Sequence, residues 1–128
     1  MHMLHHLSFA VVDLARSATF YDATLAKLGY VRVWAVDTAI GYGSTGGGDK
    51  FAIKLGRTGA VVPGEGFHVA FAAPSREAVA SFYQEALEHG GKDNGGSGLH
   101  PEYGNHYYAA FVFDPDGYRI EAVFNEKR

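Results

Sequence analysis

The sequence repeats itself at a distance of 62 residues, and this repeat limits the folds that the chain can adopt. Residues 6–29 (HLSFAVVDLARSATFYDATLAKLG) align without a gap on residues 68–91 (HVAFAAPSREAVASFYQEALEHGG). Eight of the 24 aligned positions are identical, whereas chance at ordinary residue usage would give roughly one or two. The chain therefore contains two copies of one structural unit.

Each copy predicts a strand followed by a helix. An alternating run comes first, and a residue suited to capping a helix follows it, Asp13 in the first copy and Ser75 in the second. A glycine stands where each helix would end. In the second copy, apolar residues recur at the spacing of one buried helix face, namely at Val79, Phe82, Tyr83, Ala86 and Leu87.

Further strand candidates follow each predicted helix, with turn signals between them. The first copy contains YVRVWAV, AIGYG and KFAIKL, and the second contains NHYYAAFVF and YRIEAVF. The first strand after the second helix is only weakly indicated. The glycine-rich stretches GYGSTGGGD and GGKDNGGSG are predicted to be loops, and neither has the spacing of a phosphate-binding loop.

These elements predict an α+β fold built from two tandem β-α-β-β-β modules. One such module cannot bury a sheet face alone, so we expect the two copies to associate, either in one chain or across a dimer. We expect a single domain over residues 1–128, with module one at about 1–64 and module two at about 65–128.

Length and composition exclude several functional classes. A chain of 128 residues can bury its own core, and a net charge of -3 is too small to indicate a nucleic-acid partner. The absence of cysteine excludes disulfides and thiolate metal ligands. No apolar stretch approaches the ~20 residues of a membrane span, and no signal-peptide pattern opens the chain. We therefore expect a cytoplasmic protein without a membrane partner.

Two histidines occupy the same position of the repeat, His6 in the first copy and His68 in the second. Because side chains alternate along a strand, both are predicted to lie on the face opposite the core residues Phe9 and Phe71. Their neighbours on that face are small, as the wall of a concave pocket requires. His5 is predicted to point to the other face. If a pseudo-two-fold axis relates the copies, the paired histidines approach it symmetrically, which favours a shared metal.

A carboxylate in the last predicted strand strengthens this hypothesis. Glu121 interrupts the apolar residues of DPDGYRIEAVF, and the corresponding stretch of the first copy, DKFAIKL, aligns Lys54 with it. A buried glutamate needs a partner because its desolvation is costly. That partner is either a metal ion or Lys54, and the sequence leaves both possibilities open.

Three segments together resemble the superfamily of glyoxalases, bleomycin-resistance proteins and extradiol dioxygenases, also called vicinal oxygen chelate proteins. They are HHLSFAVVDLARSATFY, FHVAFAA and FDPDGYRIEAV, and the resemblance covers nearly the whole chain. It implies that the modules form a curved mixed sheet around a central cavity with a divalent metal on its floor. Carried over by position, the metal ligands are His6, His68 and Glu121. The place of a fourth ligand falls on Lys54, which as an ammonium cannot ligate.

The resemblance implies a metal-dependent, glyoxalase-like enzyme that works as a homodimer. Its small substrate would chelate the metal through adjacent oxygens, in chemistry of the lyase or isomerase type. A nitrogen and oxygen ligand set accepts zinc, nickel, manganese, cobalt or iron. Among the candidate residues, Glu121 and Tyr108 are expected to be catalytic, and the expected substrate-binding residues are Lys54, Arg119, Tyr42, Tyr103 and Tyr107.

A metal-free binding protein of the bleomycin-resistance type is the alternative hypothesis. Its cavity would sequester a small aromatic or antibiotic-like ligand between Trp34, Tyr42, Tyr103 and Tyr107, with Glu121 paired to Lys54. The two hypotheses differ in whether His6, His68 and Glu121 converge on one point. A purely structural module is less favoured, because two histidines on a face of small residues gain nothing for packing.

Overall fold

The chain folds as two successive β-α-β-β-β units, which the repeat predicts. The computed structural model describes residues 3–56 and 62–125. The first unit comprises β1 (Leu7–Val11), α1 (Leu14–Ala26), β2 (Val31–Val36), β3 (Ala39–Gly43) and β4 (Phe51–Leu55). The second comprises β5 (Val69–Ala72), α2 (Arg76–Glu88), β6 (Lys92–Leu99), the 3-10 helix η1 (Pro101–Tyr103), β7 (Tyr107–Phe113) and β8 (Arg119–Asn125).

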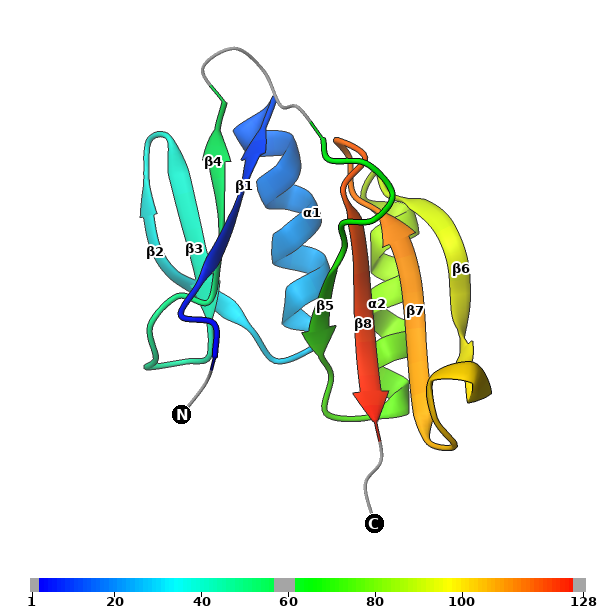
Figure 1. Ribbon diagram of the computed structural model, residues 1–128. Helices are drawn as coiled ribbons and strands as arrows, with labels where there is room; N and C mark the ends of the chain where they lie inside the picture. Colours follow the sequence, from blue (N-terminus) through cyan, green and yellow to red (C-terminus); the bar gives the residue numbers. More distant parts are fainter. Residues whose placement is uncertain (1–2, 57–61, 126–128) are drawn as a thin grey trace.

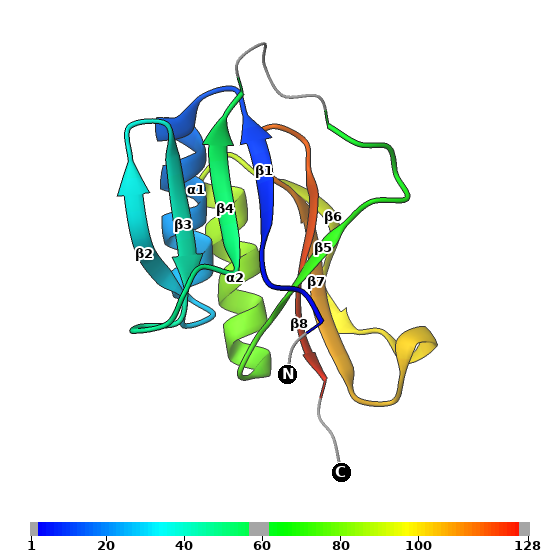
Figure 2. The same cartoon turned by 60° about the vertical axis from the view of Figure 1, so that its left-hand side comes forward.

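The strands form two four-stranded mixed sheets of the same topology. Their orders are β1-β4-β3-β2 and β5-β8-β7-β6. The pairs β1 with β4 and β5 with β8 are parallel, and the remaining neighbours are antiparallel. The sheets lie side by side with β1 and β5 nearest each other, and both helices cover the same side of them (Figures 1 and 2). The α+β fold of two tandem modules is confirmed.

Both helices begin at the residues predicted to cap them. The Asp13 side chain accepts a hydrogen bond from the backbone nitrogen of Arg16 at 3.1 Å, and the Ser75 side chain accepts one from Ala78 at 3.0 Å. These bonds satisfy amide groups that have no partner within the helix. Among the described residues, no helix is long and apolar enough to cross a membrane.

Aromatic side chains join the two sheets, which share no backbone ladder over the described residues. Phe9 of β1 stacks on Tyr118, which precedes β8, with ring centroids 4.0 Å apart. The Tyr118 hydroxyl also donates a hydrogen bond to the backbone oxygen of Ala10 at 2.6 Å. Phe51 of β4 and Phe71 of β5 meet edge to face at 5.1 Å. The two modules therefore share one core through side-chain packing.

A buried polar contact fastens the turn before β8 to helix α1. Tyr21 of α1 donates a 2.6 Å hydrogen bond to the carboxylate of Asp114, which is 3% exposed. Asp114 also accepts bonds from the backbone nitrogens of Asp116 and Tyr118. Burial raises the pKa of both Asp114 and Tyr21 above their ordinary values. The acidic turn of module two thus rests on the helix of module one.

The stretch GGKDNGGSG differs from the prediction, because most of it belongs to strand β6. Residues 92–99 pair with β7, with an irregularity between Asp93 and Ser97. The Asp93 side chain closes this irregularity by accepting bonds from the backbone nitrogens of Gly95 and Gly96, at 3.0 and 2.7 Å. Glycine carries little strand propensity, so the pairing comes from the neighbouring strand and not from local sequence.

We expect Tyr21→Phe to lower the free energy of unfolding by about 1–3 kcal/mol, because it removes a buried donor from the Asp114 carboxylate. Chemical denaturation measures the change. The matched control is Tyr83→Phe, whose hydroxyl donates to Asp93 at the exposed surface and whose loss should leave stability unchanged. An equal effect of the two substitutions would contradict a special role for the buried contact.

Candidate functional site

Glu121 is a buried carboxylate at the centre of a polar cluster on the second sheet. It lies on β8 and is 1% exposed. Its Oε1 atom lies 3.1 Å from Nε2 of His68, which directly precedes β5. Its Oε2 atom accepts a 2.5 Å hydrogen bond from the hydroxyl of Tyr107, the first residue of β7. Strand β8, the start of β7 and the residue before β5 therefore bring one side chain each to the same place.

The strand register explains why these side chains meet. Glu121 lies opposite Ala70 on β5 and Phe111 on β7. His68 and Tyr107 are an even number of residues from those partners, so alternation sends all three side chains to the face away from the helices. The hydrogen bonds offset the cost of burying the carboxylate. Burial, together with the bond to Glu121, raises the pKa of Tyr107, which keeps its hydroxyl protonated as a donor.

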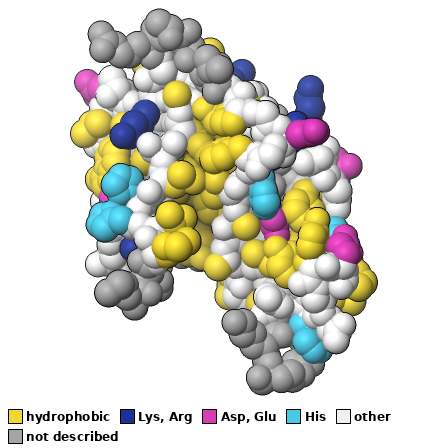
Figure 3. Space-filling view, viewed as in Figure 1, with side chains coloured by type: hydrophobic (Ala, Val, Ile, Leu, Met, Phe, Trp, Pro, Cys, Tyr) yellow, Lys and Arg dark blue, Asp and Glu magenta, His cyan; other side chains and the backbone are white. Residues whose placement is uncertain are grey.

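A hollow of about 500 Å³ opens over this cluster. Aromatic rings form much of its wall, where Tyr103 lies 5.3 Å from Tyr107 and Phe111 lines the same hollow. His100 packs against Phe111 from outside the lining, edge to face at 5.0 Å. Figure 3 views the face that carries it, where histidine and acidic side chains lie together among hydrophobic ones on the right-hand half. The lining consists of Glu65, His68, Asn94, Tyr103, Tyr107, Phe111, Arg119, Ile120 and Glu121.

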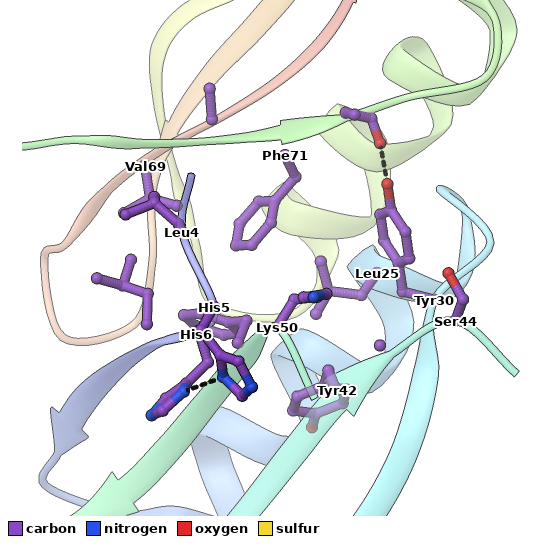
Figure 4. A pocket seen from close by; sticks show the side chains of 15 residues that line it. Leu4, His5, His6, Leu25, Tyr30, Tyr42, Ser44, Lys50, Val69 and Phe71 are labelled. Atoms are coloured by element: carbon purple, nitrogen blue, oxygen red, sulfur yellow. Dashed lines mark hydrogen bonds between the residues drawn. The ribbon is translucent and has the colours of Figure 1, made fainter. Parts of the chain in front are cut away.

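His6 lies in a different place, at an apolar crevice of about 260 Å³ between β1 and β5. Figure 4 shows it beside His5, with Phe71 on the opposite wall. The Nδ1 atoms of His5 and His6 are 2.8 Å apart, and both side chains are exposed. The sequence predicts that His5 points to the sheet face opposite that of His6. Their ring nitrogens instead contact each other, so the two side chains do not diverge to opposite faces.

The described part of the chain therefore holds an incomplete set of metal ligands. His68 and Glu121 are adjacent, but no group of three His, Asp or Glu side chains in residues 3–56 and 62–125 is arranged to hold a metal ion. Protein metal sites of this ligand type use at least three side chains. His6 does not join His68 and Glu121 within one chain.

The predicted substrate-binding residues of module two fall in the hollow, whereas Tyr108 does not. Arg119 and Tyr103 line the hollow, and Tyr107 contacts Glu121. Tyr108 faces the helices because it lies opposite Phe124, which is an odd number of residues from Glu121 along β8. Its ring lies 5.2 Å from the guanidinium of Arg76 on α2. The tyrosine beside Glu121 is therefore Tyr107.

Lys54 lies on the other sheet and does not pair with Glu121. Ser8 lies opposite Ala52 in module one, as Ala70 lies opposite Glu121 in module two. The residue equivalent to Glu121 is therefore Ala52, so the alignment of Lys54 with Glu121 is two positions out of register. The length of the loop before β4 sets this alignment, and the sequence alone does not show that length. Lys54 is exposed and lines a separate hollow with Thr38, Ala39, Leu55 and Gly56.

The remaining aromatic candidates of module one also lie outside the hollow. Tyr42 is buried, and its hydroxyl donates to Asp22 of α1 at 2.8 Å. Trp34 covers Gly41, where an added Cβ would clash with the indole nitrogen. Trp34 and Tyr42 therefore do not form one wall with Tyr103 and Tyr107.

Among the aromatic side chains of this region, sequence reasoning missed His100, Phe111 and Phe113. Phe111 lies opposite Glu121 and Phe113 lies opposite Arg119. Their even spacing from Tyr107 along the predicted strand NHYYAAFVF was a usable signal, since alternation places all of them on one face. His100 offered no such signal, because it stands in an irregular segment before η1.

The sequence and the fold match a known family. The family model of the Glyoxalase/Bleomycin resistance protein/Dioxygenase superfamily matches residues 3–122. The chain belongs to this superfamily. A comparison with curated proteins found no match. The superfamily of the chain is therefore shown, and a particular activity within it is not.

Solved structures extend the superfamily likeness over almost the whole chain. A glyoxalase/bleomycin resistance protein from Albidiferax ferrireducens T118 is 31% identical, with a TM-score of 0.83 over 95% of this chain and 98% of that one. A protein from Bacillus halodurans is 27% identical, with a TM-score of 0.71 over 96% of each chain. A glyoxalase-related enzyme from Fulvimarina pelagi shares the fold at 24% identity, with a TM-score of 0.73 over 98% of this chain and 89% of that one.

We expect Tyr107→Phe to lower the free energy of unfolding by about 1–3 kcal/mol, because Glu121 loses one of its two donors while it stays buried. Urea denaturation monitored by circular dichroism measures this. Tyr103→Phe is the matched control, since its ring borders the same hollow and no hydrogen bond joins its hydroxyl to Glu121. If both variants unfold at the wild-type urea concentration, the Tyr107 bond does not stabilise the fold.

Proposed function

We propose that the chain is a glyoxalase-like, metal-dependent enzyme of the lyase or isomerase type. Its substrate is a small molecule that chelates the metal through adjacent oxygens. The observation that carries this proposal is the contact between the buried Glu121 carboxylate and the half-exposed His68 imidazole on the floor of an open hollow. An oxygen and a nitrogen donor at one accessible point are what a divalent transition metal prefers.

The third ligand in this proposal is His6 of the partner subunit in a homodimer. His6 and His68 hold the same position of the repeat, directly before β1 and β5. Both are exposed, so neither is committed to the core of its own module. A two-fold dimer that faces module one of each copy to module two of the other would bring these positions together twice.

The residues of the chain have distinct tasks in this site. Zinc, nickel, manganese, cobalt or iron, when bound, would supply Lewis acidity to the substrate oxygens. Glu121 offers its Oε1 atom toward His68, because Tyr107 holds the Oε2 atom. Arg119 and the rings of Tyr103 and Phe111 border the space in which a substrate would lie.

Three further parts of the proposal concern organisation and location. We take the chain as one domain over residues 1–128, with modules that meet at about residue 64. Its partner is a small molecule and a second copy of itself. Its location is the cytoplasm.

Metal content and a mixing experiment test the composite site. Purified without chelator, the wild type should carry about one transition metal per chain, and His6→Ala and Glu121→Ala should each carry none. Co-refolding the two variants at equal amounts should restore about a quarter of the wild-type metal, because half of the dimers are mixed and each holds one intact site. Elemental analysis measures the metal, and circular dichroism checks that each variant folds.

The outcomes separate the possible arrangements. Metal in the wild type with no recovery on mixing would place the complete site within one chain and remove the shared dimer site. A wild type that takes up no divalent metal, even after reconstitution, would remove the metal-dependent enzyme altogether.

A second candidate function is metal-free sequestration of a small aromatic or antibiotic-like ligand. Its supporting observation is that Glu121 already accepts hydrogen bonds from Tyr107 and contacts His68, so its burial needs no cation. The aromatic wall of the hollow would then hold the ligand by stacking. If this function is correct, chelator-treated protein binds the ligand, and its affinity for the ligand does not change when zinc or nickel is added.

A further inference from the structure

We propose that the hollow over Glu121 takes a planar aromatic anion whose negative group pairs with Arg119. This inference rests on the proposed function in one respect, because it takes the hollow for the substrate site. It goes further by naming the ligand class, and it requires no metal ion.

Arg119 is the cation that this hollow offers to a ligand. Its guanidinium carbon lies 5.4 Å from the centroid of the Phe113 ring, which fixes the side chain against the sheet. In the described part of the chain it makes no ion pair, whereas Arg16 pairs with Asp116 and Arg32 with Asp22. A half-buried guanidinium that lacks a carboxylate partner is suited to a bidentate contact with a planar oxyanion.

The rings around Arg119 favour a flat ligand. Tyr103, Tyr107 and Phe111 line the hollow together, and Tyr103 lies within 6.5 Å of both other rings. Aromatic faces at such separations attract other π systems through offset and edge contacts. The volume of about 500 Å³ admits a molecule of one or two fused rings.

The other charges of the hollow favour an anion over a cation. Glu121 is the buried carboxylate of the lining, and both of its oxygens are engaged, one by Tyr107 and one by His68. In the metal-free protein these bonds take up part of its acceptor capacity, so Glu121 attracts a cationic organic ligand less than an unpartnered carboxylate would. Glu65 is the other acidic residue of the lining, and it is exposed to solvent, which screens its charge.

Two probes of nearly equal shape test the inference on chelator-treated protein. They are 1-naphthoate and the uncharged 1-naphthalenemethanol, and titration calorimetry measures their affinities. We expect the wild type to bind naphthoate at least about tenfold more tightly than the alcohol, as a charge-assisted bond implies. Arg119→Gln should remove this tenfold preference by weakening naphthoate alone.

Arg76→Gln is the matched control. Arg76 also lies over a tyrosine ring, at 5.2 Å from Tyr108, but on the helix side of the sheet. Its substitution should leave both affinities unchanged. Phe111→Leu should weaken the two probes to a similar extent, because it removes a stacking wall and no charge.

Each remaining result overturns the inference. Equal affinity for the two probes, no binding of either, or an unchanged naphthoate preference in Arg119→Gln would exclude a planar anion held by Arg119. These failures are distinct from failure of the metal-dependent function, because metal content is measured on the same wild-type protein in a separate experiment.

Discussion

The stacking of Phe9 on Tyr118 is the contact on which the arrangement of the two modules depends. Each module completes its own sheet, and no two strands of the described chain pair across the junction. Side-chain contacts therefore hold the modules together, among them the ring contacts, the Tyr118 bond to the Ala10 carbonyl, and the buried pair of Tyr21 and Asp114. Hydrophobic burial supplies the attraction at such a junction, and the directional hydrogen bonds fix the relative orientation.

The polar cluster follows from a constraint on the second sheet. A carboxylate on the inner position of a central strand is tolerated only where neighbouring strands provide donors. The partners of Glu121 come from the beginnings of β5 and β7, which flank β8. The equivalent position of module one holds Ala52, so the duplicated fold keeps its geometry while only one copy carries the acid. At this position the two modules therefore differ in their side chain and not in their strand pairing.

Much of this structure could be predicted from the sequence because it depends on local rules. Caps at Asp13 and Ser75, the alternation of the strands and the repeat gave the α+β fold and the tandem modules. The site was only partly predictable. His68 and Glu121 are brought together by pairing between β5 and β8 within one module, whereas the position of His6 depends on how modules are placed in space, which no local pattern encodes.

Other differences have equally definite physical causes. Only the antiparallel register of β7 on β8 shows whether Tyr107 or Tyr108 lies beside Glu121. A shift of one residue along a strand moves a side chain to the other face of the sheet. The misalignment of Lys54 with Glu121 arose in the glycine-rich loop before β4. Such a loop has no repeating side-chain pattern from which its length could be predicted. Strand β6 was hidden because glycine has no side chain to create an alternating pattern. Its pairing is supplied by β7, and its irregularity is closed by Asp93.

The absence of a ladder between β1 and β5 has a consequence for how such a protein diversifies. A sheet that continued across the junction would lock the angle between its halves, since any rotation would break a row of backbone hydrogen bonds. Side-chain contacts such as that of Phe51 on Phe71 tolerate small rotations by repacking. Substitutions at the junction can therefore adjust the aperture between two intact halves, so that one duplicated scaffold accommodates molecules of different size without redesign of either sheet.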